Sequence, residues 1–343
     1  MCLGCRTTDV RSSPQPSYSI YRDPKGGAHM PTVEPDPRQR NANVIALANN
    51  KGGAGKSTIT ANLAGALADR GHKVLVLDID LSGDLRVAFG IDNHELNDEG
   101  TSLVDAILDP SAPLPVIVEG IRPGIDWIPG GMQIWHLVQA QIREDFPIAT
   151  RFAEVLAEIS GDYDYVLLDC PPSNPPLQEM VLAATRWLMV PARPDPTNWA
   201  GLQKIGPVVR HVRQWYNPHL AWLGVVIFGM PAGASRITRI TLDYLGAASG
   251  TVPVLNSTIR YQSAAALGGQ VNGRLAAELA ADRKGETTAV IKALRARKTP
   301  AVVSDADRIP ASIDKLAADY SRLADEVISR TTAAPAKKRG ATK

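Results

Sequence analysis

The stretch that decides the fold reads Asn50-Lys51-Gly52-Gly53-Ala54-Gly55-Lys56-Ser57-Thr58. It follows an apolar run at 44–48, which predicts a buried strand, and it precedes residues 59–71, which predict a helix that ends at Gly71. A glycine-rich loop between a strand and a helix is the setting of a phosphate-binding loop. The glycines let backbone N–H groups reach phosphate oxygens, and the helix N-terminus adds partial positive charge.

Two side chains of this loop have defined chemical tasks. Lys56 is long enough to reach the β- and γ-phosphates of a nucleotide, and the hydroxyl of Ser57 is suited to ligating Mg²⁺. The residues predicted to bind the nucleotide are therefore Lys51, Gly52, Gly53, Ala54, Gly55, Lys56, Ser57 and Thr58.

The loop departs from the general phosphate-binding pattern at its start. Asn50 stands where the first glycine is expected, and a second lysine, Lys51, follows it. This Lys-Gly-Gly-x-Gly-Lys-Ser-Thr form resembles the deviant Walker A loop of the ParA/MinD family of ATPases. The resemblance implies that ATP is held between the subunits of a homodimer and that Lys51 reaches the partner's nucleotide, as an arginine finger does. A solvated surface lysine is the alternative interpretation of Lys51.

Two apolar strand patterns end in acidic residues. The first ends in Asp78-Ile79-Asp80 and resembles the family's Asp-x-Asp segment, which implies that Asp80 orients the attacking water and that Asp78 lies near Mg²⁺. The second ends in Asp169, with Cys-Pro-Pro after it, and resembles the family's Walker B strand, which implies that Asp169 holds Mg²⁺. The predicted catalytic residues are Lys51, Lys56 and Asp80, and the predicted metal site consists of Ser57, Asp78 and Asp169.

The segment after Asp80 differs from the family's pattern. The family continues Pro-Gln-Gly-Asn, whereas this chain has Leu81-Ser82-Gly83-Asp84. The glycine is kept and its neighbours are not, which leaves the local geometry after Asp80 and the rate of hydrolysis open.

Weaker resemblances continue to about Gly273. The run 227–231 occupies the position where the family builds its adenine pocket, so Met230 and Pro231 are expected to bind the base. The residues expected to contact DNA without sequence preference, through phosphates, are Arg236, Arg239, Arg260, Lys292 and Arg295. Solvated surface charge is the alternative for each of them.

Apolar strand patterns alternate with helical ones from Asn43 onward, which predicts an α/β fold with a mostly parallel, twisted sheet and helices on both faces. Strands are expected at 43–48, 73–79, 126–128, 164–169, 187–191, 223–229 and 252–255. Residues 1–41 have the composition of a disordered leader, with Met30 as an alternative start, and residues 330–343 form a basic flexible tail. A single ATPase domain is expected over 42–329, with C-terminal helices at 272–298 and 313–328.

Composition narrows the function classes. The formal net charge is only +2, no apolar run approaches the length of a membrane span, and the first thirty residues have no apolar region typical of a signal peptide. Cys2, Cys5 and Cys170 form no disulfide framework, which fits a reducing cytosol, and Cys170 is interpreted as a small buried apolar residue.

The resemblance implies a cytoplasmic, nucleoid-associated partitioning ATPase of a prokaryote, with ATP and Mg²⁺ as cofactors. Its ATP dimer would bind DNA non-specifically, and hydrolysis stimulated by a ParB-like partner would release it. A membrane-associated positioning ATPase like MinD is the first alternative, although the Ala-, Pro- and Lys-rich C-terminus offers no apolar face to lipid. A metabolic enzyme on the same fold is the second, and an iron–sulfur protein is disfavoured because Cys170 is the only core cysteine.

Overall fold

The computed structural model describes residues 41–142, 147–172, 174–231, 252–261, 273–295 and 309–332. The strands are β1 (Val44–Leu47), β2 (Val74–Asp78), β3 (Val118–Arg122), β4 (Ile125–Ile128), β5 (Tyr165–Asp169), β6 (Trp187–Ala192), β7 (Ala221–Met230) and β8 (Val254–Arg260).

The helices lie between and after these strands. They are α1 (Lys56–Ala68), α2 (Asp84–Phe89), α3 (Thr101–Leu108), α4 (Trp135–Ile142), α5 (Ile148–Ile159), α6 (Pro175–Ala183), α7 (Pro196–Trp215), α10 (Ala276–Arg295) and α11 (Ile313–Thr332), with short 3₁₀ turns η1 (Met132–Ile134) and η2 (Ser160–Asp162).

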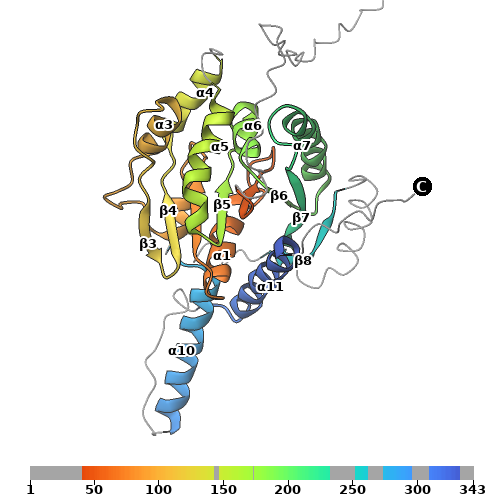
Figure 1. Ribbon diagram of the computed structural model, residues 1–343. Helices are drawn as coiled ribbons and strands as arrows, with labels where there is room; N and C mark the ends of the chain where they lie inside the picture. The colour runs from red at the N-terminus through yellow and green to blue at the C-terminus, as the bar shows by residue number, and fades with distance from the viewer. Residues whose placement is uncertain are drawn as a thin grey trace, which may run out of the picture. The chain divides into compact units, whose positions relative to one another are not determined.

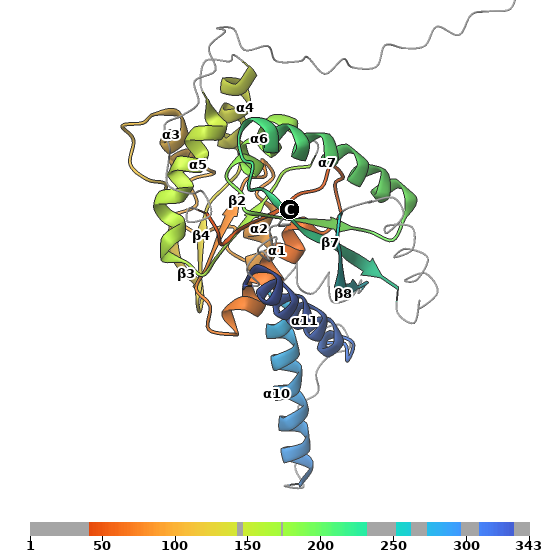
Figure 2. The ribbon, with the colours of Figure 1, turned by 45° about the vertical axis from the view of Figure 1, so that its right-hand side comes forward.

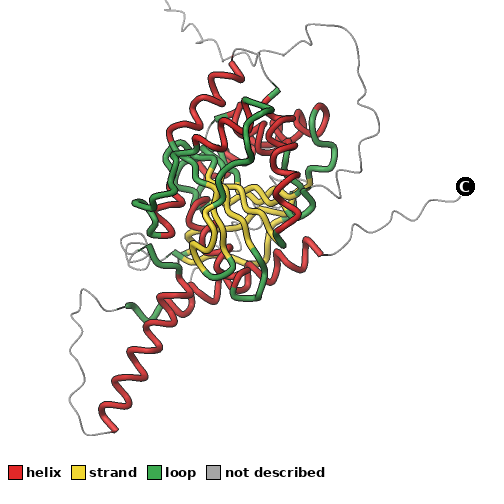
Figure 3. Tube along the Cα trace, turned by 60° about the vertical axis from the view of Figure 1, so that its left-hand side comes forward, coloured by secondary structure: helices red, strands yellow, loops and turns green. Residues whose placement is uncertain are grey.

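An eight-stranded sheet in the order β3-β4-β2-β5-β1-β6-β7-β8 forms the centre of the molecule (Figure 1). Neighbouring strands are parallel except for β3 and β4, which are antiparallel. Helices cover both faces of the sheet, which confirms the predicted α/β fold (Figure 3). β3 was not predicted, because its sequence Val-Glu-Gly-Ile-Arg has no apolar run and it lies at an edge with mostly accessible side chains.

The central strand β1 shows how the two helical layers are built. Val44 and Ala46 pack into one core with residues of α3, α5, α6 and α7, whereas Ile45 and Leu47 pack into the other with residues of α1, α10 and α11. Successive side chains of a strand point to opposite faces, so a strand covered on both sides needs an unbroken apolar run. This is why the sequence of the inner strands was easy to interpret.

The edge strand β8 is covered by α11. The carboxylate of Glu326 accepts hydrogen bonds from the backbone N–H groups of Asn256 and Ser257, at 2.9 and 2.8 Å. Asp319, which is 2% exposed, accepts one from the backbone N–H of Arg260 at 3.1 Å. Amides on the outer side of β8 therefore find their acceptors on a helix.

The C-terminal helices confirm two predictions. α11 packs against α1, α10 and β8, as expected of a terminal helix with an apolar stripe. α10 begins beside α1, where the side chain of Asn62 accepts a hydrogen bond from the N–H of Ala276 at 2.8 Å, and its second half runs away from the sheet (Figure 2). Residues 1–40 of the predicted leader and 333–343 of the predicted tail lie outside the described residues. The tail was predicted to begin at Arg330, but residues 330–332 belong to α11, where Arg330 pairs with Glu326 at 2.7 Å. No helix within the described ranges is long and apolar enough to cross a membrane.

Candidate functional site

The predicted motifs meet at one edge of the sheet. The glycine loop follows β1, the Asp78–Asp80 segment follows β2, and Asp169 ends β5, which lies between β1 and β2. In the strand register Asp169 is paired with Leu47 on one side and with Asp78 on the other. Because the carboxyl ends of parallel strands share an edge, residues far apart in the sequence form one site.

The loop is shaped to present backbone N–H groups. Gly55 has φ +90°, which a residue with a Cβ rarely adopts, and it precedes the first residue of α1 with no side-chain cap. The start of the loop is fixed by Asn49, whose side chain donates to the carbonyl oxygen of Pro191 at 2.5 Å and accepts from the N–H of Lys51 at 3.1 Å. An uncapped helix N-terminus behind a glycine loop is an anion-binding site.

Lys56 is a buried cation that forms no direct ion pair within the described residues. The residue is only 6% exposed, and no carboxylate in the described part of the chain lies within ion-pair distance of its ammonium group. A buried ammonium group is unfavourable unless an anion accompanies it. The position of Lys56 in the loop therefore requires an anionic ligand, as a nucleotide phosphate would be.

Asp169 is a second buried charged group of the site, and its carboxylate oxygens have no hydrogen-bond partner of their own among the described residues. Burial raises the pKa of Asp169 to about 7, and the Ser57 hydroxyl and the Lys56 charge offset only part of that rise. A carboxylate held in this way beside a hydroxyl fits a hard cation such as Mg²⁺.

Asp78 and Asp80 differ in their surroundings. The oxygens of Asp78, which is fully buried, accept the backbone N–H groups of Asp80 at 3.0 Å and Leu85 at 3.1 Å. Burial and the neighbouring Asp169 raise the pKa of Asp78 well above its usual range. Asp80 faces the cavity and accepts the N–H of Ser82 at 3.1 Å. Asp78 thus shapes the turn that carries Asp80, and we keep its proximity to Mg²⁺ as a prediction.

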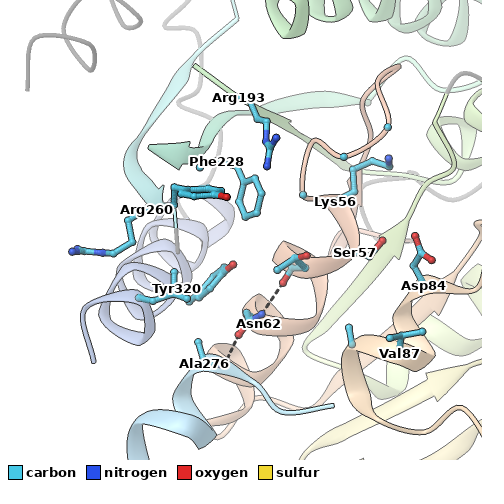
Figure 4. A pocket seen from close by; sticks show the side chains of 18 of the residues that line it. Lys56, Ser57, Asn62, Asp84, Val87, Arg193, Phe228, Arg260, Ala276 and Tyr320 are labelled. Carbon is cyan, nitrogen blue, oxygen red and sulfur yellow. Dashed lines mark hydrogen bonds between the residues drawn. The ribbon is translucent and has the colours of Figure 1, made fainter. Parts of the chain in front are cut away.

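A cavity of about 520 Å³ joins these groups. Figure 4 shows it running from the glycine loop, past Ser57 and Asn62 of α1, to Tyr320 of α11. β7 presents Phe228 and Gly229 to the cavity, whereas Met230 is buried elsewhere and Pro231 is exposed, so neither lines it as the sequence suggested. The lining residues that the sequence did not single out for nucleotide binding include Asn62, Ser82, Asp84, Arg193, Tyr261, Arg274 and Tyr320.

Residues 42–222, more than half of the chain, match the AAA domain family AAA_31. The chain is also 32% identical over 186 residues to the chromosome partitioning protein ParA of Caulobacter vibrioides, covering 54% of this chain and 68% of ParA. The chain belongs to this family, as a P-loop ATPase of the ParA/MinD type.

Solved structures show the same fold in proteins of different activity. The ATP complex of a variant of McdA from Cyanothece superposes with a TM-score of 0.66 at 16% identity, covering 84% of this chain and 97% of McdA. Cobyrinic acid a,c-diamide synthase from Mycobacterium smegmatis, with bound ADP and magnesium, superposes with a TM-score of 0.57 at 24% identity, covering 76% and 99%. The fold of the ATPase therefore does not by itself distinguish a partitioning protein from a metabolic enzyme.

The distinguishing lysine of this ATPase lies at the rim of the site. The side chain of Lys51 is 42% exposed, and its ammonium nitrogen lies 3.9 Å from a carboxylate oxygen of Asp195, just before α7. The contact is long and solvent-accessible, so it restrains Lys51 only weakly.

The residues expected to contact DNA have different surroundings. Arg236 and Arg239 lie outside the described residues, as do residues 333–343 of the basic tail. Lys292 and Arg295 belong to the last turns of α10, and Arg295 is exposed. Arg260 forms a bidentate ion pair with the buried Asp319, at 2.5 and 2.8 Å, so its guanidinium already has a partner within the ATPase.

Cys170 is fully buried, as predicted, and burial raises the pKa of its thiol.

Proposed function

We propose that this ATPase is a ParA-type partitioning protein, which binds DNA non-specifically as an ATP-dependent dimer and leaves it after hydrolysis stimulated by a ParB-like partner. The observation that carries the proposal is the position of Lys51, whose 42% exposed side chain directly precedes the cavity-lining residues Gly52 and Gly53. The reach of this lysine fits the nucleotide of a second subunit.

The residues of the site divide the work of phosphoryl transfer. The loop N–H groups and Lys56 bind the phosphates, and Lys51 of the partner subunit adds positive charge as negative charge develops on the transferred group. Asp80 faces the cavity, where its carboxylate orients the attacking water for in-line displacement. Asp169 and Ser57 would hold Mg²⁺, which would supply positive charge to the phosphate chain.

Adenosine is expected at the other end of the cavity. Tyr320 offers aromatic surface there, and Leu279 and Leu316 offer aliphatic surface from α10 and α11. These replace Met230 and Pro231 as our proposed contacts of the base. An apolar compartment joined to a phosphate-binding loop is what a nucleoside triphosphate requires.

DNA binding is supported by charge. Cations are concentrated near the end of α10, at Lys292 and Arg295, and in residues 330–343, which contain no acidic residue. Each cation that neutralises a DNA phosphate adds affinity without reading the base sequence. Dimerisation would double the number of these cations on one particle, which explains why DNA binding would depend on ATP.

The test compares binding of the full chain to random-sequence duplex DNA with ADP and with ATP plus Mg²⁺, at several salt concentrations. Wild-type protein should bind DNA only with ATP, with affinity falling steeply as salt rises. Lys51→Ala should lose DNA binding, whereas Lys204→Ala, which removes an exposed lysine of α7, should keep it.

Binding of the full chain to anionic liposomes and to Mg²⁺-ATP is measured alongside. ATP-dependent binding to liposomes and not to DNA would replace the proposal with a positioning ATPase like MinD. Binding to neither, with Mg²⁺-ATP still bound, would favour a metabolic enzyme on this fold.

A further inference from the structure

Three arginines line the nucleotide cavity, and two of them are neutralised by carboxylates. Arg260 is paired with Asp319 of α11, as described above. Arg274 is paired with Glu278 at 3.2 Å and with Asp282 at 2.6 Å, both on α10. Their charges are therefore satisfied by the protein itself, whether or not a ligand is present.

Arg193, the third, has no such partner. It follows directly after β6, and no group in the described ranges forms a hydrogen bond or an ion pair with its guanidinium. Its Nε atom is buried without an acceptor, although the residue as a whole is half-buried, and the guanidinium carbon lies 6.0 Å from the centroid of the Phe228 ring. Burying a charged donor without an acceptor is unfavourable, so the position points to an anionic ligand.

The protein holds this arginine beside the phosphate-binding loop. β6 is the neighbour of β1, and the Asn49 side chain ties the end of β6 to the start of the loop. The Phe228 ring packs against the last loop glycine, since a Cβ on Gly55 would lie 2.5 Å from it. Figure 4 shows the guanidinium of Arg193 pointing between Phe228 and the loop that carries Lys56.

The acidic groups of the cavity lie elsewhere. Asp80 and Asp84 line it, and neither is within ion-pair distance of Arg193. Figure 4 shows Asp84 on the other side of α1 from Phe228. Because the cavity belongs to a P-loop ATPase, the anion that enters it beside the loop is the phosphate chain of the nucleotide.

We propose that Arg193 is a nucleotide-binding residue, whose guanidinium donates hydrogen bonds to the phosphate chain of ATP bound in its own subunit. It adds a third cation to those of Lys51 and Lys56. A guanidinium suits this task because its fixed donors match phosphate oxygens and its face stacks on an aromatic ring. The proposal deepens the assignment of the ATP site and requires neither DNA binding nor a ParB-like partner.

The test measures the affinity of the full chain, with Mg²⁺, for a non-hydrolysable ATP analogue, for ADP and for adenosine. Arg193→Met should weaken binding of the ATP analogue by about tenfold or more, as loss of a charge-assisted hydrogen bond does. Arg193→Lys should recover part of the loss. Arg210→Met, which removes the same charge from an exposed position on α7 outside the cavity lining, should have a much smaller effect. Equal loss for ADP would place the contact on the α- or β-phosphate, and loss for ATP alone on the γ-phosphate.

Adenosine separates phosphate binding from a structural role. If Arg193 contacts phosphate, the Met variant should bind adenosine as wild type does and unfold at the same temperature without ligand. An ATP affinity within about twofold of wild type, or an equal loss for adenosine and ATP, would overturn the proposal. Should the Met variant fail to fold, Arg193→Gln carries the same comparison. Failure of the wild type to bind Mg²⁺-ATP would overturn the assignment of the whole site instead.

Discussion

Replacing Asp169 by Asn should stabilise the metal-free protein while abolishing its use of Mg²⁺. Burial raises the pKa of Asp169 from 3.8 to about 7, so the folded state binds the proton more tightly than the unfolded state does. For such a group the contribution to stability is unimpaired below about pH 4 and is lost as the pH rises toward 7. A difference of about three pKa units corresponds to at most about 4 kcal/mol at pH 8. Asparagine has nearly the same shape and no charge, so it avoids this cost.

The measurement is urea denaturation without nucleotide, in EDTA, at pH 8.0 and pH 5.5. The Asn variant should exceed wild type by up to about 4 kcal/mol at pH 8.0 and by about 2 kcal/mol less at pH 5.5, where wild type is partly relieved. Asp105→Asn, on the exposed side of α3, is the matched control and should change neither value. A variant no more stable than wild type at pH 8.0, or a gain independent of pH, would refute the reasoning. Mg²⁺ should stabilise wild type only.

Three further outcomes follow from the packing and the site. Gly130→Ala should cost about 3 kcal/mol in urea denaturation, because the new Cβ would lie 1.9 Å from the backbone carbonyl oxygen of Asp78; an unchanged midpoint would contradict the close approach. Asp319→Ala should cost about 2 kcal/mol, since it leaves Arg260 without its partner while the 27% exposed guanidinium keeps some contact with water; a loss below about 0.5 kcal/mol would show the pair to be dispensable. Removing Mg²⁺ with EDTA should abolish phosphate release from ATP, and added Mg²⁺ should restore it; turnover that persists in EDTA would contradict the role of Asp169.

The parts of the fold that could be predicted are those with an unbroken physical signal. β1, β2 and β5 are buried on both faces, so each is a continuous apolar run, and the glycine loop after β1 has a pattern that few other structures require. β3 could not be found in this way, because only Val118 of that strand is buried.

The residues that line the cavity were harder to predict, because they depend on how neighbouring strands are aligned and not on the hydrophobic pattern of the sequence. β7 and β8 shift register between Phe228 and Met230, and the choice of which β7 side chain faces the nucleotide is made by that irregularity. Arg193 is a single residue at the end of a strand, with nothing in its neighbourhood of the sequence to mark it. The pairing of Arg260 is decided by Asp319, 59 positions away, and is visible only when α11 packs on β8.

The acceptors that α11 presents to β8 also bear on how copies of this chain can meet. The unpaired N–H and C=O groups of an edge strand can pair with a strand of a second chain, and repeated pairing of this kind leads to aggregation. The backbone N–H groups of Asn256, Ser257 and Arg260 cannot pair with another strand, because they already donate hydrogen bonds to Glu326 and Asp319. In the DNA-bound state that we propose, copies crowded on one DNA molecule would therefore not extend the sheet at β8 into a fibre, which ATP hydrolysis could not take apart.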